Sequence, residues 1–108
     1  METKTDCVPF KEKTPVLKGA ALRTPLFQLE DWEVVDEHHL VKTYKFPDFK
    51  QALAFVNRVG EIAECANHHP DIDLTWGKVT LKIWDHKLDG LTENDFILAA
   101  EIDQSNAC

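Results

Sequence analysis

The sequence lacks several motifs that mark common classes of enzyme. It contains no glycine-rich phosphate loop, no serine nucleophile motif and no pair of neighbouring cysteines. Phosphate binding by a P-loop and serine-type acyl transfer are therefore not expected. The three cysteines, Cys7, Cys65 and Cys108, are odd in number and widely spaced. This pattern predicts free thiols in a reducing compartment rather than a disulfide framework or a CxxC metal site.

Long apolar runs and basic clusters are also missing. No run approaches the roughly 20 residues that cross a bilayer, and the N-terminus lacks the apolar stretch of a signal peptide. The chain has 12 Lys and Arg against 19 Asp and Glu, a formal net charge of −7. Phosphate backbones and anionic lipid repel such a chain. We expect a cytoplasmic protein, with a nuclear location also open, that binds neither nucleic acid nor membrane directly.

The length of 108 residues suits a single domain. Residues 1–14 are polar and without periodicity, which predicts a flexible N-terminal tail, and residues 15–108 form the expected domain. Helical spacing of apolar residues and short alternating runs predict helices and strands in the following order. The ranges are helix 17–29, strands 32–35 and 40–46, helix 49–69, strands 72–76 and 78–85, and a helix after Thr92.

This order predicts an α+β fold of the form α-β-β-α-β-β-α, with a four-stranded antiparallel sheet covered by helices on one face. Asp48 is expected to cap the long helix and Pro70 to prevent its continuation. Pro25 should kink or restart the first helix. Thr92 should cap the last helix, with acidic residues in its first turn, where the helix dipole favours them.

The residues with the clearest chemical potential are three histidines and a carboxylate. Glu64 and His68 are four positions apart, so a helix through residue 69 would put them on one face, with His69 turned by about 100°. His86 follows 17 residues after His69, at the end of a strand. If that strand end meets the helix end, the rings converge on one pocket. Because imidazole both gives and accepts protons near neutral pH, this set indicates general acid–base catalysis.

Simpler interpretations stand beside this one. The His68–His69 pair could merely cap a helix, and His38–His39 is expected to be a solvated hairpin turn. A metal site is disfavoured, since adjacent helix positions point apart and no HExxH spacing is present. Three further expectations concern apolar and acidic residues. Phe49, Leu53 and Phe55 should be core, Glu61 should be a solvated charge, and Trp76 and Trp84 could be either sheet packing or walls for a flat ligand.

The full pattern resembles the pterin-4a-carbinolamine dehydratase family. The resemblance runs from about Leu17 to Asp103. Its motif comprises Glu64, His68-His69-Pro70, Trp76, Lys78-Val79, His86, Gly90-Leu91-Thr92 and Asp95, preceded by Pro25, Trp32, Phe46-Pro47-Asp48-Phe49, Ala54-Phe55-Val56 and Arg58-Val59. Three features depart from the family's usual pattern: Asp85 replaces a threonine, Trp76 replaces a tyrosine, and the turn Lys87-Leu88-Asp89 differs from the commoner version built of small residues.

The resemblance implies an enzyme that dehydrates 4a-hydroxytetrahydrobiopterin to quinonoid dihydropterin, with a pterin substrate and no cofactor or metal. His68 and His86 would exchange protons with the hydroxyl and N5, and His69 would polarise the ring or act as a second base. Glu64 would hold the pterin. The remaining substrate contacts would be Asn67, Trp84, Asp85 and Lys87. The resemblance also implies a homodimer or homotetramer. It leaves open an alternative role as a dimerisation cofactor for a transcription factor, or as an assembly factor.

Overall fold

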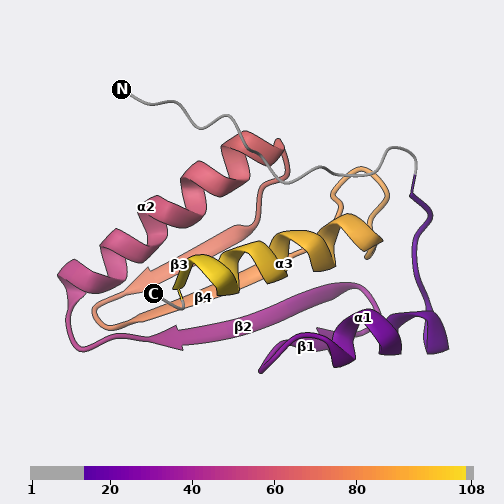
Figure 1. The fold of residues 1–108 in the computed structure, drawn as a ribbon, viewed down its shortest axis with the longest axis horizontal. Helices are drawn as coiled ribbons and strands as arrows, with labels where there is room; N and C mark the ends of the chain where they lie inside the picture. The colour runs from indigo at the N-terminus through magenta and orange to yellow at the C-terminus, as the bar shows by residue number, and fades with distance from the viewer. Residues whose placement is uncertain (1–13, 107–108) are drawn as a thin grey trace.

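The computed structural model describes residues 14–106 and confirms the α+β fold (Figure 1). The expected tail and two cysteines, Cys7 and Cys108, lie outside the described residues. The elements follow the predicted order, with a short 3-10 helix, η1, before the first α-helix. Their bounds are η1 Gly19–Leu22, α1 Arg23–Phe27, β1 Glu33–Val35, β2 His39–Lys45, α2 Phe49–Ala66, β3 Asp71–Thr75, β4 Lys78–Ile83 and α3 Glu93–Asn106.

The four strands form one antiparallel sheet in the order β1-β2-β4-β3. Figure 1 shows α2 and α3 side by side on the same face of this sheet, and they contact each other. The covered face of β4 consists of alternate residues, since Val79, Leu81 and Ile83 are fully buried. Leu40 and Tyr44 of β2 extend the same buried face.

Helix α2 begins where the sequence predicts. The Asp48 side chain accepts a hydrogen bond from the Gln51 amide at 2.9 Å, which satisfies one of the unpaired donors of the first turn. Phe55 is fully buried. The expectation that Phe49 and Leu53 are also core is wrong, because they are 43% and 40% exposed. Their side chains lie on the flank of the amphipathic helix rather than beneath it.

The first helix is shorter than predicted. Instead of one helix over residues 17–29, the chain forms η1 and then the five-residue α1. Pro25 is the third residue of α1, within the first turn, where the missing amide hydrogen removes no helical bond. The proline therefore restarts the helix rather than kinking a longer one.

None of the helices within residues 14–106 is both long enough and apolar enough to cross a membrane.

The prediction of free thiols is wrong for Cys65, which is disulfide-bonded.

Candidate active site

One cavity of about 210 Å³ brings together seven of the eight residues that the sequence singles out. Its lining is Asn67, His68, His69, Trp84, Asp85, His86 and Lys87. The eighth residue, Glu64, is outside this lining but bonds to His69. The volume falls below the roughly 300–1,000 Å³ of pockets that enclose drug-sized ligands. A cavity of this size is suited to a small ring.

The end of α2 differs from the prediction, and the difference sets the direction of both histidines. The helix stops at Ala66, and Asn67 adopts the left-handed conformation with φ 55°. The Asn67 amide donates to Glu64 O, and the His68 amide donates to Ala63 O, at 3.3 and 3.1 Å. This pair of bonds is a Schellman motif, which satisfies the last carbonyls and turns the chain out of the helix. His68 and His69 therefore follow the helix rather than belong to it.

Glu64 consequently pairs with a different histidine from the one expected. A helix continuing to residue 69 would put Glu64 beside His68, whereas Glu64 Oε2 lies 2.6 Å from His69 Nε2. Both side chains are exposed, at 80% and 50%, so the pair sits at the rim of the cavity. A carboxylate accepts here, so the hydrogen of His69 lies on Nε2.

His68 instead pairs with Asp95 of α3. His68 Nε2 lies 2.5 Å from Asp95 Oδ1, and the two side chains are 15% and 0% exposed. The other oxygen, Oδ2, accepts from the Thr92 amide at 2.7 Å and from the Thr92 hydroxyl at 3.3 Å. Asp95 thus supplies the carboxylate half of a capping box at the start of α3. One buried carboxylate both begins a helix and fixes the orientation of an imidazole.

The sequence predicts Asp95 in the first turn of the helix but does not predict its contact with His68. A Thr-x-x-Asp capping box uses one carboxylate oxygen, which leaves the second for another donor. That unused acceptor was the available signal. Its partner, however, lies 27 positions away and could not be identified without the fold.

His86 reaches the cavity from the loop that joins β4 to α3. Asp85 shapes this loop, since its Oδ1 accepts from the Lys87 and Leu88 amides at 2.9 and 2.8 Å. The backbone of Asp85 also pairs with Gly90, and a Cβ at Gly90 would meet the Val16 side chain at 2.9 Å, so a larger residue there would displace Val16. Asp85, one of the three residues that depart from the usual pattern, therefore stabilises the loop that carries His86.

The surroundings of His86 are acidic and aromatic. Its Nε2 lies 3.9 Å from Asp71 Oδ1 on β3, and its ring meets Trp84 edge-on with centroids 4.3 Å apart. The two interpretations left open for the tryptophans are now separated. Trp84 lines the cavity, whereas Trp76 is 67% exposed in the β3–β4 turn.

The expectation of a solvated turn at His38–His39 is only partly correct, because His38 lies in the turn but is partly buried. His39 begins β2, and both rings contact Trp84, with centroid distances of 5.3 and 5.7 Å. The two Nδ1 atoms lie 3.0 Å apart, and His38 Nε2 lies 2.8 Å from Asp89 Oδ1. This contact joins positions 51 apart in the chain, so local pattern could not predict it.

The surroundings of His39 alter its pKa. Burial lowers the pKa of His39 below its ordinary value of 6.5, and the nearby His38 and Lys82 act in the same direction. Asp36 and Asp71 oppose the shift. The folded protein therefore favours the neutral form of His39.

We expect the free energy of unfolding to decrease less in His39→Gln than in the parent when the pH is lowered below 6.5. Above pH 6.5, His39 is neutral in both the folded and unfolded chains and contributes no pH dependence. As the pH falls from 6.5 toward the lower folded pKa, the unfolded chain gains a proton that the folded chain does not, so the free energy of unfolding decreases. For one proton this slope is at most about 1.4 kcal/mol per pH unit.

Urea unfolding at pH 7.5 and pH 5.5 measures the effect. The parent should lose more stability than His39→Gln over this interval. Between pH 7.5 and 8.5 the two proteins should change in parallel. An equal acid loss in both would contradict the assigned shift.

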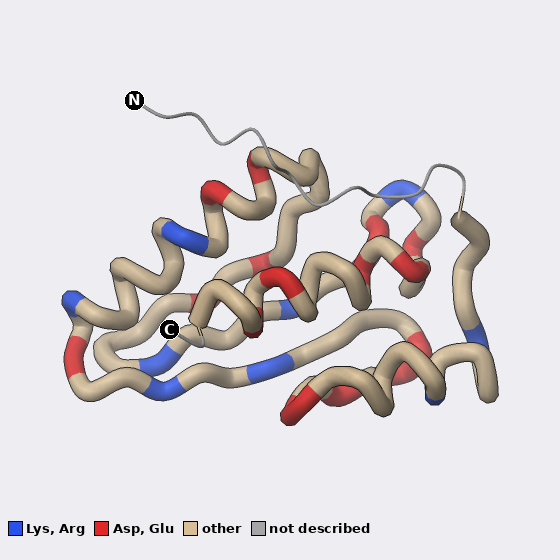
Figure 2. The backbone as a smooth tube through the Cα atoms, in the orientation of Figure 1, with Lys and Arg blue, Asp and Glu red and all other residues tan. Residues whose placement is uncertain are grey.

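Each imidazole of the cavity thus faces a carboxylate. The pairs are His68–Asp95, His69–Glu64 and the looser His86–Asp71. Figure 2 shows acidic positions along the last turns of α2 and around the β4–α3 loop, the two segments that supply these rings. Within residues 14–106, no group of three or more His, Cys, Asp or Glu side chains has a geometry that could hold a metal ion. The arrangement is suited to moving protons at a small, polar ring.

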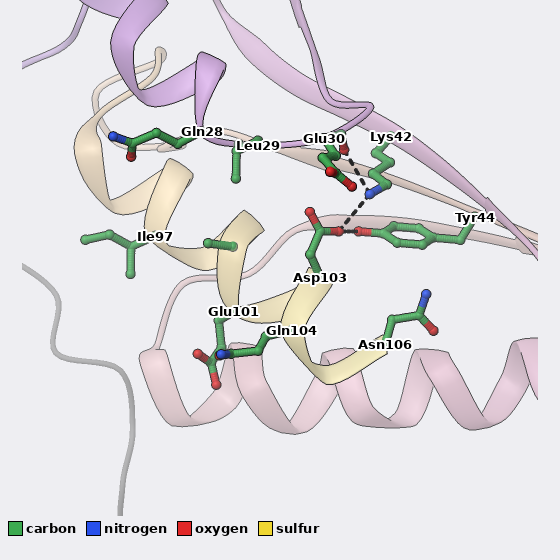
Figure 3. A pocket seen from close by; sticks show the side chains of 11 residues that line it. Gln28, Leu29, Glu30, Lys42, Tyr44, Ile97, Glu101, Asp103, Gln104 and Asn106 are labelled. Carbon is green, nitrogen blue, oxygen red and sulfur yellow. Dashed lines mark hydrogen bonds and ion pairs between the residues drawn. The ribbon is translucent and has the colours of Figure 1, made fainter. Parts of the chain in front are cut away.

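A second and larger cavity, of about 800 Å³, lies between residues 28–30, which follow α1, and the elements α3 and β2 (Figure 3). Three of its ionisable groups, Lys42, Tyr44 and Asp103, bond to one another. Asp103 accepts from Lys42 Nζ at 2.9 Å and from the Tyr44 hydroxyl at 2.5 Å on one oxygen, and from Trp32 Nε1 at 2.9 Å on the other. Burial, with Asp103 adding to it, raises the pKa of Tyr44 well above its usual value, so the phenol remains a donor. This cluster fastens α3 to the sheet, and no histidine lines the cavity.

Comparison with known proteins points to one family. Residues 15–105 match the family model described as "Pterin 4 alpha carbinolamine dehydratase". Proteins named "Putative pterin-4-alpha-carbinolamine dehydratase" are similar along nearly their whole length. One from Rubrobacter xylanophilus is 54% identical, covering 92% of each chain, and one from Alkaliphilus metalliredigens is 42% identical, covering 94% of this chain and 92% of the relative.

A solved structure is similar as well. It is described as a transcriptional coactivator/pterin dehydratase from Brucella melitensis. The two structures align with a TM-score of 0.78 and 26% sequence identity, covering 83% of this chain and 97% of the other.

Proposed function

This chain belongs to the pterin 4 alpha carbinolamine dehydratase family, and from that membership we propose that it dehydrates 4a-hydroxytetrahydrobiopterin to quinonoid dihydropterin and water. The observation that carries the proposal is the convergence of three imidazoles, from two separate segments, on one small cavity. Such a reaction would recycle tetrahydrobiopterin after its use in hydroxylation.

The chemistry needs only proton transfer. The N5 lone pair expels the hydroxyl from C4a, one imidazole gives that hydroxyl a proton, and another takes the proton from N5. Carbon, nitrogen and oxygen keep their oxidation states, and one water leaves. No metal or organic cofactor is required. General acid–base catalysis of this kind contributes about 10²–10⁴-fold.

We assign the proton-transfer roles to His68 and His86. His68 is held by a buried carboxylate, which supports its role because a fixed ring keeps one tautomer and one direction. His86 is half exposed beside Trp84, an environment that suits exchange of protons with solvent between turnovers. His69 is proposed to polarise the ring or act as a second base.

The remaining site residues are proposed to bind the pterin. The aromatic face of Trp84 can stack on a flat ring. The amide of Asn67, the carboxylate of Asp85 and the ammonium of Lys87 can bond its polar edge, with Glu64 acting through His69 at the rim. The exposed Phe49 and Leu53 of α2 support a further proposal that the chain forms a homodimer or homotetramer.

The direct test is stopped-flow absorbance on 4a-hydroxytetrahydrobiopterin, with a simpler 4a-hydroxy pterin in parallel. We expect dehydration well above the spontaneous rate at catalytic concentrations of protein. Comparison of the two substrates reports how far the side chain contributes to binding. Rates equal to buffer alone for both pterins would exclude the proposed activity.

A binding role is the second candidate, because the similar Brucella melitensis protein is described as a coactivator as well as a dehydratase. Such a role would use helix surfaces outside the cavity. Variants of the cavity histidines separate the two functions, since they would abolish dehydration and leave adaptor binding intact.

A further inference from the structure

Three imidazoles surround Trp84, and two of them do not line the cavity. His86 meets the indole ring at 4.3 Å, while His38 and His39 meet it at 5.3 and 5.7 Å. Trp84 and His86 line the cavity, whereas His38 and His39 are absent from its lining. The hairpin between β1 and β2 therefore supports one wall of the cavity from outside.

A hydrogen bond ties this hairpin to the loop that carries His86. His38 Nε2 lies 2.8 Å from Asp89 Oδ1. Asp89 in turn is anchored within the loop, since its amide donates to Asp85 O at 2.7 Å. Asp89 has φ 56°, a conformation that aspartate, asparagine and glycine adopt more readily than other residues. The bond between His38 and Asp89 therefore connects the β1–β2 hairpin to the β4–α3 loop.

The proton positions of the histidine pair follow from these contacts. Because a carboxylate only accepts, His38 carries a hydrogen on Nε2. The Nδ1 atoms of His38 and His39 are 3.0 Å apart, so one of them donates and the other must be bare. The pair consequently holds at most one positive charge while the contact lasts. Three further groups act on His39. The positive charge of Lys82 disfavours protonation of His39, whereas the carboxylates of Asp36 and Asp71 favour it.

We propose that His38 and Asp89 are positioning residues, which hold Trp84 and the His86 loop in the arrangement that receives the pterin. The kinetic consequences of this proposal rest on the proposed dehydratase function, whereas its structural consequences rest on the geometry alone. His38 touches Trp84 directly, and Asp89 fixes His38 from the loop on which His86 lies. Neither His38 nor Asp89 lines the cavity, so each would act through Trp84 and His86.

The experiment compares four variants with the parent. Asp89→Gly removes the carboxylate and tolerates the left-handed backbone, while Asp89→Asn keeps an oxygen acceptor there. His38→Ala removes the other partner. Asp31→Gly is the matched control, because Asp31 is likewise exposed with φ 64° but precedes β1 and lies outside the cavity lining.

Loss of one orienting hydrogen bond should lower kcat/KM by roughly three- to tenfold in Asp89→Gly and in His38→Ala. Asp89→Asn should stay within about twofold of the parent, as should Asp31→Gly. The double variant of His38 and Asp89 should lose little more than either single variant, because both remove the same contact. Additive losses would indicate two independent effects and overturn the pairing.

Nuclear magnetic resonance of the protein without substrate supplies a readout independent of turnover. The Trp84 indole N–H and the His86 ring signals should shift in Asp89→Gly and His38→Ala, and stay in place in Asp31→Gly. Unchanged signals, with kcat/KM within twofold of the parent, would overturn the proposal. A parent that does not accelerate dehydration would refute the proposed function alone, and the resonance shifts would still decide whether these residues position the loop.

Discussion

His86→Ala should slow carbinolamine dehydration by about 10²–10⁴-fold, and His68→Ala by a similar factor. The reason is that each imidazole is proposed to move one of the two protons that the elimination transfers. His86→Ala is the cleaner variant, because the side chain is half exposed and its nearest carboxylate is 3.9 Å away. Its folding stability should therefore match that of the parent.

Three further measurements sharpen this prediction. Added imidazole should restore part of the activity of His86→Ala, since the half-exposed cavity admits a small ring. The double variant should fall by less than the product of the single losses, because the two groups act in one step. Glu61→Gln, an exposed acid on α2, should behave as the parent. Full turnover by both single variants would remove the histidines from the mechanism.

Asp95→Ala should carry the largest cost in stability among the variants considered, because the side chain is fully buried and bonded through both oxygens. Loss of the helix cap and of the His68 contact together should lower the free energy of unfolding by about 2–4 kcal/mol. Activity per folded molecule should also fall, by tenfold or more, because the His68 ring loses the group that orients it.

Asp95→Asn should lie between Ala and the parent. Its amide oxygen can replace one carboxylate oxygen, but the amide nitrogen then faces a donor on the other side. Glu93→Ala is the matched control, an exposed acid in the same first turn, and should cost at most about 1 kcal/mol. Urea unfolding and the dehydratase assay measure the two effects separately. Parent-like stability in Asp95→Ala would contradict the capping role.

The features that the sequence predicts correctly depend on residues that are close to one another in the chain. The cap at Asp48 depends on residues within a few positions, and this prediction is confirmed. The burial of Val79, Leu81 and Ile83 likewise follows the two-residue alternation of a strand. The end of α2 was misjudged because His68 and His69 continue the helical spacing. The tolerance of Asn67 for a left-handed conformation outweighed that pattern, and the helix stopped three residues early.

The pairing of side chains across the fold could not be predicted. The spacing of Glu64 and His68 predicts that they share a face only if the helix continues to residue 69, whereas the helix ends at Ala66 and Glu64 pairs with His69. The partners of His68 and His38 lie 27 and 51 positions away, on elements whose relative placement no periodicity encodes. Phe49 and Leu53 were assigned to the core because spacing reports a helix face and not how much of that face another element covers.

The two oxygens of Asp95 have a consequence for large mutational surveys. A screen that measures cellular abundance would class substitutions at this position as a loss of protein. It would therefore assign the residue a structural role only. Its part in chemistry would appear only in a screen that divides product formed by the amount of folded protein recovered.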